Sequence, residues 1–214
     1  MRLDRRVASK LAPTTTGYTI SVHPNQLPLF PLGTVLFPGG LLPLRIFEPR
    51  YLELIRDSAR NGSGFGICLI LEGTEVGEPA LPAALGCEAR IVDFSTTADG
   101  LLGIVVQGER RFHVERTKVR DNGLIVAEVQ WLSESPPARI RPEHQLLSIL
   151  LGRILEKANA PFEKAELEDA DWVAWRLAEW LPLLMPHRQA LLQENDPHQR
   201  LQRLIEHLPE FQQA

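Results

Sequence analysis

The most constraining feature of the chain is a run of short apolar segments interrupted by prolines, in residues 27–51 (LPLFPLGTVLFPGGLLPLRIFEPRY). Proline lacks a backbone N–H, so it lies at strand ends, edges and bulges rather than in the centre of a hydrogen-bonded sheet. The run predicts short strands with sharp turns, followed by a helix that begins at Pro49. We therefore expect a small, irregular β-barrel rather than a regular sandwich. The prolines are Pro28, Pro31, Pro38, Pro43 and Pro49.

Further strands are predicted up to about residue 132. Two turn signals, at Asp99-Gly100 and in residues 121–123 (DNG), separate apolar runs in the manner of hairpins. Residues 72–85 contain glycines and prolines and predict a loop, and we expect Gly108 to interrupt a strand. Phe94 is expected to face inward. The expected strands span residues 65–71, 87–94, 101–107, 110–119 and 124–132.

The hydrophobic period changes after residue 133 from two to about 3.6, which indicates helices. Pro142 is expected to begin the first helix, Asp169 or Asp171 to cap the second, and Pro186 and Pro197 to begin two more. The apolar face of the first helix consists of Leu146, Leu147, Leu150, Leu151, Ile154 and Leu155. The predicted organisation is a flexible N-terminal tail, a barrel subdomain, a linker and a helical subdomain, at residues 1–25, 26–132, 133–141 and 142–214.

Composition narrows the class of function. The net charge is −4, so the chain as a whole lacks the basic character expected of a nucleic-acid-binding protein. Its two cysteines form neither a zinc pattern nor a disulfide framework. No apolar run has the length of a membrane span, and the N-terminus has no apolar segment typical of a secretory signal. We expect a cytoplasmic protein with no membrane contact.

No arrangement of residues predicts catalysis. The glycine-rich residues 62–66 (GSGFG) follow a predicted helix and precede a strand, which is the reverse of the order in a phosphate loop or a serine elbow. The six histidines include no H-x-x-x-H pair, so no metal site is expected. The acidic residues 163–171 are best explained as a solvated face and a helix N-terminus. We therefore expect a protein that is not an enzyme and that uses no cofactor.

Two sets of side chains are candidates for a binding surface. Where the barrel meets the first helix, a polar set consists of Arg45, Glu48, Arg50 and Tyr51. These residues either contribute to a surface that grips an extended peptide, or Arg45 and Glu48 pair locally while Tyr51 packs on the barrel. On the predicted second helix, Trp172 and Trp175 share a side. They either pack against the helix at residues 146–155 or form a partner-binding patch.

The chain resembles the N-terminal substrate-binding domain of Lon proteases from about residue 27 to residue 208. Residues 27–51 are similar to the signature strand pair and first helix of that family. Residues 86–91 (GCEARI) resemble its G-T-x-A-x-I strand, with Cys87 in place of the usual threonine. Residues 100–111 (GLLGIVVQGERR) and 177–208 resemble its next strand and its helical end. These segments occur together and in the family's order, which makes the resemblance specific.

The resemblance implies an α+β fold, in which a PUA-like irregular β-barrel with one helix precedes a C-terminal helical bundle. Nothing in the sequence matches G-x-x-x-x-G-K-[ST], the phosphate-binding loop of the ATPase module that follows this domain in Lon proteases. The resemblance therefore implies a stand-alone, non-enzymatic module that recognises unfolded or flagged polypeptides, with a protease or a chaperone as a further candidate partner. The alternative is an RNA-binding PUA-like module, which the net charge opposes.

Overall fold

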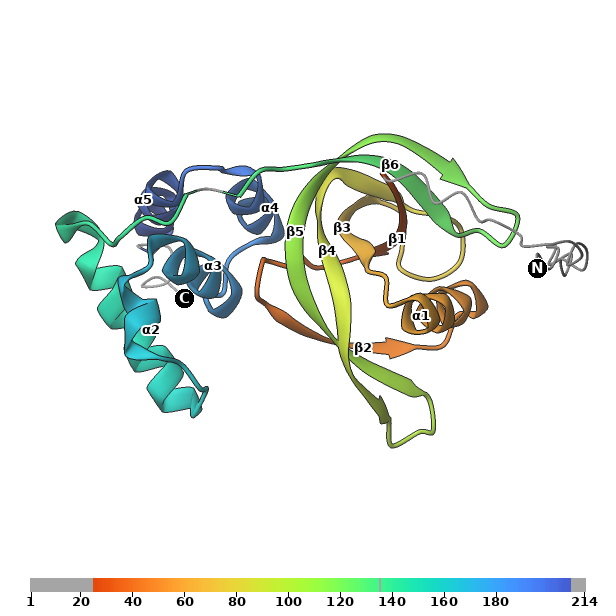
Figure 1. Cartoon of the computed structure of the whole chain (residues 1–214), viewed down its shortest axis with the longest axis horizontal. Helices are drawn as coiled ribbons and strands as arrows, with labels where there is room; N and C mark the ends of the chain where they lie inside the picture. The colour runs from red at the N-terminus through yellow and green to blue at the C-terminus, as the bar shows by residue number, and fades with distance from the viewer. Residues whose placement is uncertain (1–24, 135, 209–214) are drawn as a thin grey trace, which may run out of the picture.

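The structure is a computed structural model that describes residues 25–134 and 136–208 (Figure 1). Residues 1–24 of the predicted tail and the last six residues lie outside the described ranges. Six strands and the helix α1 come first in the chain: β1 (Gln26–Leu32), β2 (Leu41–Ile46), α1 (Pro49–Asn61), β3 (Phe65–Glu72), β4 (Leu81–Thr96), β5 (Leu102–Val119) and β6 (Ile125–Trp131). The helical part follows: η1 (Pro142–His144), α2 (Gln145–Ala158), η2 (Lys164–Glu168), α3 (Ala170–Trp180), α4 (Met185–Gln193) and α5 (Pro197–His207).

The strands form a closed circuit. The sheet order is β2-β5-β4-β3-β1-β6, and an additional pairing joins β5 to β6. Because β5 is long, its first half pairs with β2 and its second half with β6, while β4 lies along its other edge. The strands β1, β3, β4, β5 and β6 thus surround a core, and β2 lies outside the circuit. The helices α2 to α5 pack together at one end of the barrel (Figure 1). The predicted α+β fold is confirmed.

The strand β5 is continuous, so the prediction that Gly108 breaks it is wrong. The Gly39 N–H donates to the Gly108 carbonyl at 2.8 Å, and the Gly108 N–H donates to the Gly40 carbonyl at 2.9 Å. A Cβ atom at residue 108 would lie 2.2 Å from the Phe37 carbonyl oxygen. The glycine is therefore required because the loop after β1 lies against the backbone of β5 at this point.

The strand β4 is longer than predicted at both ends. It begins at Leu81, inside the expected loop, and it extends to Thr96. Phe94 is 52% exposed, which corrects the expectation that it faces inward. Its environment explains the difference, because β3 pairs with β4 only as far as Ala89, and beyond that point β4 pairs with β5 alone.

The helix α1 closes one side of the barrel core. It begins at Pro49 as predicted, and it ends at Gly62, whose φ of 61° is in the left-handed region that glycine adopts without strain. Its buried face includes Tyr51, Leu54 and Ile55, which pack on the apolar cluster inside the barrel.

A second apolar cluster joins the barrel to the helices. Val35, Phe37 and Leu85 from the barrel part belong to the same cluster as the buried faces of α2, α3, α4 and α5. On α2 the buried leucines are Leu147, Leu151 and Leu155. Leu146 is 78% exposed, so its predicted place on the apolar face is wrong. The i, i+4 spacing of the three buried leucines defines a narrower stripe than the sequence pattern suggested.

Candidate functional site

A pocket of about 300 Å³ lies beside β2, between that strand, the start of α1 and the loop that contains Glu75 and Val76. Most of its apolar lining is contributed by β1 and by the inward side of β2. We call it the β2 pocket. Three of the predicted site residues line it, namely Arg45, Glu48 and Tyr51. Its apolar lining residues include Phe30, Leu32, Leu42, Leu44 and Ile46.

Tyr51 contributes its ring to the β2 pocket. The ring stacks on Phe30 with centroids 3.8 Å apart and an interplanar angle of 14°. Burial raises the pKa of the Tyr51 hydroxyl, which Arg50 partly opposes, and the hydroxyl is therefore neutral at physiological pH. The expectation that Tyr51 packs on the barrel is correct, and its ring also forms part of the pocket wall.

The charged residues of the predicted set do not pair as expected. Arg45 forms an ion pair with Asp99 in the β4–β5 turn. Glu48 pairs with Arg50, whose Nη2 lies 2.9 Å from the Glu48 Oε2. Arg50 is buried and does not line the pocket. Its Nη1 donates to the Gly123 carbonyl at 3.3 Å, so it connects α1 to the β5–β6 turn.

Trp172 and Trp175 line a different pocket, also of about 300 Å³, between the barrel and α3. Trp175 is 7% exposed and stacks on Phe37 with centroids 5.7 Å apart. Its neighbours therefore include the loop after β1, whereas the sequence pattern pointed to α2. Trp172 is half-buried against the shared apolar cluster. The predicted binding residues thus divide between two separate places.

Two buried arginines, Arg111 and Arg200, lie beside Trp175, and no sequence pattern indicates their burial. The Arg200 guanidinium lies 3.7 Å from the centroid of the Trp175 ring, and that of Arg111 lies 5.4 Å away. Arg200 pairs with Asp171 and donates to the Glu194 carbonyl at 2.6 Å. Burial lowers the pKa of Arg200 to about 9, so it remains charged at neutral pH. This cluster connects barrel and helices.

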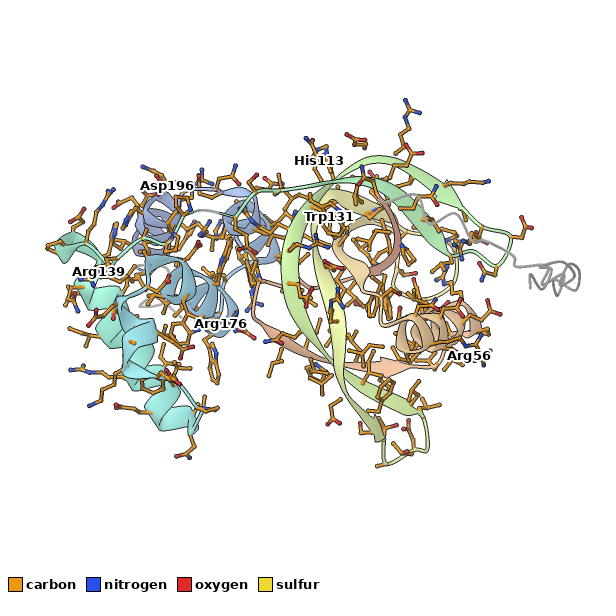
Figure 2. The ribbon with its side chains drawn as sticks, in the orientation of Figure 1. Arg56, His113, Trp131, Arg139, Arg176 and Asp196 are labelled. Atoms are coloured by element: carbon orange, nitrogen blue, oxygen red, sulfur yellow. The ribbon has the colours of Figure 1, made fainter. Side chains whose placement is uncertain are left out.

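One further arginine joins the two parts from α3. The Arg176 Nη2 donates to the Pro38 carbonyl at 2.7 Å, and its Nη1 donates to the Gly39 carbonyl at 2.9 Å. Figure 2 labels Arg176 on the helical part of the molecule. The loop that approaches Gly108 is therefore held from the helical side as well. The arginine side chains at this junction bind backbone carbonyls and make a structural interface.

The basic residues in residues 110–120 do not form one patch. Arg110 pairs with the buried Glu88 and lies 3.9 Å from the centroid of the Trp131 ring. Arg111 donates to the Leu192 carbonyl at 2.9 Å. The remaining three, Arg116, Lys118 and Arg120, line a pocket of about 330 Å³ on the β5–β6 hairpin, together with Glu128.

Two histidines meet where η1 contacts α5. The rings of His144 and His198 are stacked with centroids 5.5 Å apart, and their Nδ1 atoms are 3.4 Å apart. One Nδ1 must donate and the other accept, so double protonation would remove this contact. Burial lowers the pKa of His144, Glu143 opposes that shift, and His198 and Arg141 add to it.

This pair predicts a dependence of stability on pH. The unfolded chain binds a proton at His144 near pH ~6.5, whereas the folded chain binds it only at lower pH. We expect the free energy of unfolding to fall as the pH is lowered through that range, and urea unfolding between pH 7 and pH 5 measures it. His144→Gln should show a shallower slope, and His113→Gln, at an exposed position, should keep the wild-type slope. Equal slopes in all three proteins would contradict the assignment.

Within residues 25–134 and 136–208, no three His, Cys, Asp or Glu side chains are grouped so as to hold a metal ion. No helix in these ranges has both the length and the apolar character needed to cross a membrane.

The barrel and the attached helices have the fold of the domain found at the N-terminus of Lon proteases. The family described as "ATP-dependent protease La (LON) substrate-binding domain" matches residues 26–210. The match covers most of the chain, so the chain belongs to this family, as its resemblance implied.

Solved structures agree with this assignment. A crystal structure of a Lon N-terminal domain protein from Xanthomonas campestris is 50% identical, with a TM-score of 0.73, and the match covers 85% of this chain and 97% of that one. The N-terminal domain of Lon protease from the Mycobacterium avium complex has the same fold at 20% identity, with a TM-score of 0.63 and coverage of 85% and 96%.

The curated relatives are much longer proteins. Lon protease of Flavobacterium johnsoniae is 26% identical over 188 residues, which is 83% of this chain and 23% of the relative. Lon protease of Methylocella silvestris is 30% identical over 131 residues, which is 59% of this chain and 16% of the relative. The chain therefore spans less than a quarter of the length of these relatives.

Proposed function

We propose that this chain recognises unfolded polypeptides by binding them, without acting on them chemically. The observation that carries the proposal is the β2 pocket, which has apolar walls and lies beside a strand in a chain of the Lon substrate-binding family. Unfolded proteins expose apolar side chains and unpaired backbone, and a pocket of this size takes one or two such side chains.

The polar groups of the β2 pocket support a binding role. Arg45 is engaged by Asp99, and Glu48 is engaged by Arg50. The Glu75 carboxylate accepts a hydrogen bond from the Gly33 N–H at 2.6 Å. These contacts stabilise the walls of the pocket.

The proposal predicts binding of a permanently unfolded protein. Fluorescently labelled α-lactalbumin, reduced and carboxymethylated, should gain anisotropy on titration with the chain, with a dissociation constant in the micromolar range. The same protein with its disulfides intact is the matched control and should not bind. Adding ATP should change neither result. If the anisotropy does not change at high micromolar concentrations of the chain, the proposal is contradicted.

RNA binding is the competing function. Arg116, Lys118 and Arg120 make no ion pair within the described residues, and this is the observation that favours it. A gel shift with structured RNA at two salt concentrations distinguishes the two functions, because phosphate contacts make affinity fall steeply with salt. We expect no shift at moderate salt.

A further inference from the structure

The strand β2 has one unpaired edge. It is the terminal strand in the sheet order and pairs with β5 alone. The Gly40 carbonyl accepts a hydrogen bond from Gly108, so the backbone groups of even-numbered residues face β5. Since the direction alternates along an antiparallel strand, the backbone groups of Leu41, Pro43 and Arg45 face away from the sheet.

The free edge offers three acceptors and two donors. Leu41, Pro43 and Arg45 each present a carbonyl, but only Leu41 and Arg45 present an N–H, because proline has none. The side chains of Leu41 and Arg45 are more than half exposed. The proline and the exposed arginine are features that limit uncontrolled edge-to-edge pairing while leaving room for a single incoming strand.

The β2 pocket runs along this same edge. Its lining includes every residue from Leu42 to Glu48, together with Thr34, Glu75 and Val76. Leu42 and Leu44 point into it from the inward face of β2, whose partners Val106 and Ile104 are buried. A strand added at the edge would direct every second side chain toward the same face, and therefore toward the pocket.

We propose that an extended polypeptide adds to the free edge of β2 as an extra strand and places one apolar side chain in the β2 pocket. This inference rests on the proposed function and specifies its mode. The occupant is an unfolded segment with apolar residues at alternate positions and a basic residue beside them.

The charge of the pocket lining favours a ligand that has a basic residue next to its apolar residue. Two carboxylates, Glu48 and Glu75, line the pocket. Arg50 balances the charge of Glu48, whereas Glu75 accepts a hydrogen bond from the Gly33 N–H and forms no ion pair within the described residues. Arg45 is the one basic residue in the described lining, and Asp99 already balances its charge. A segment with a lysine or arginine beside its apolar residue should therefore bind more tightly than one with a glutamate there.

Backbone methylation of the ligand tests the hydrogen bonds directly. A labelled nine-residue peptide with alternating apolar and polar residues is compared with two versions, N-methylated at its odd or its even positions. Only one set of amides can face β2, so we expect one version to lose about tenfold or more in affinity and the other to bind as the parent does. This comparison uses the wild-type chain.

Variants of the edge provide the converse test. Arg45→Pro removes an outward N–H and leaves the bonds to β5 intact, so it should weaken binding about five- to tenfold. Arg45→Ala keeps the N–H and is the matched control for the lost side chain. Pro43→Ala adds a donor to the edge and should tighten binding a few-fold.

The outcomes separate the two proposals. If the wild-type chain binds unfolded α-lactalbumin but both methylated peptides bind equally, the edge proposal is overturned and the proposed function stands. If the wild-type chain binds neither the peptides nor unfolded α-lactalbumin, the edge proposal and the proposed function are both overturned. Asymmetric loss between the two methylated peptides, with Arg45→Ala closer to wild type than Arg45→Pro, supports strand addition.

Discussion

Trp175→Ala is expected to lower the free energy of unfolding by about 3–5 kcal/mol, the usual cost of truncating a buried aromatic residue. Trp175 is 7% exposed and contacts both halves of the molecule, through Phe37 on the barrel side and Arg200 on α5. The substitution removes apolar contact and leaves the Arg200 guanidinium without the ring that covers it. Buried charge that loses its neighbours is costly, which places the effect at the upper end of that range.

Urea unfolding followed by circular dichroism measures this effect, with Trp180→Ala as the matched control. Trp180 lies on the same helix but is 42% exposed, so its loss should cost about 1 kcal/mol or less. Similar losses in the two variants would contradict the assignment of Trp175 to the junction between barrel and helices.

Gly108→Ala is the second substitution with a large expected effect, a loss of about 3 kcal/mol. The new Cβ would lie 2.2 Å from the Phe37 carbonyl oxygen, and a backbone atom cannot move away as the end of a side chain can. Moving the loop after β1 away from β5 would also lengthen the hydrogen bonds that Gly39 and Gly40 make with Gly108. Both effects act at the point where Phe37 meets Trp175.

The control for this prediction is Gly33→Ala. A Cβ at residue 33 would approach only the Glu75 carboxylate, at 3.1 Å, and a flexible side chain can adjust. Thermal unfolding should therefore show a clear drop in Tm for Gly108→Ala and little change for Gly33→Ala. Equal Tm values for Gly108→Ala and the wild type would show that the loop does not need this close approach.

Local features of the fold were predictable because their causes are local. Pro49 and Gly62 mark the ends of α1, and Asp169 caps α3 by accepting from the Asp171 and Trp172 N–H groups. The DNG turn lies between β5 and β6 as expected, with a φ of 82° at Gly123. Each of these residues acts on its immediate neighbours in the chain, so the sequence alone indicates its role.

Features that depend on distant contacts were not predictable. Gly108 in isolation is typical of a strand break, and only the loop after β1 makes it part of a continuous strand. Arg111 and Arg200 are ordinary surface residues by type, yet both are buried around Trp175. Nothing in the local pattern indicates that a tryptophan from α3 lies between them.

The candidate site was predictable in part for the same reason. Arg45, Glu48 and Tyr51 lie within seven residues of one another, and the strand-to-helix transition keeps them beside one pocket. The ion-pair partners of Arg45 and Glu48 were not predictable, because Asp99 reaches Arg45 only through the pairing of β2 with β5 and the turn beyond it. Trp172 and Trp175 proved to lie at the barrel–helix junction instead.

Two regions of the structure thus differ in whether their backbone groups are paired. The barrel–helix junction is filled with apolar side chains and arginines that bind backbone carbonyls. At β2, by contrast, one edge of the strand pairs with no other strand within the described residues, and the β2 pocket lies beside that edge. Sites that bind extended chains need unpaired groups of this kind on a rigid support, and the closed circuit of strands provides that support.

Amide hydrogen exchange at β2, measured with and without unfolded α-lactalbumin, tests most directly whether this edge receives polypeptide. The amides of Leu41 and Arg45 face away from the sheet, so they should exchange quickly in the free protein and slow markedly when the unfolded chain is added. The amides of Leu42 and Leu44, which face β5, should change little. Binding that leaves Leu41 and Arg45 unprotected would contradict the account.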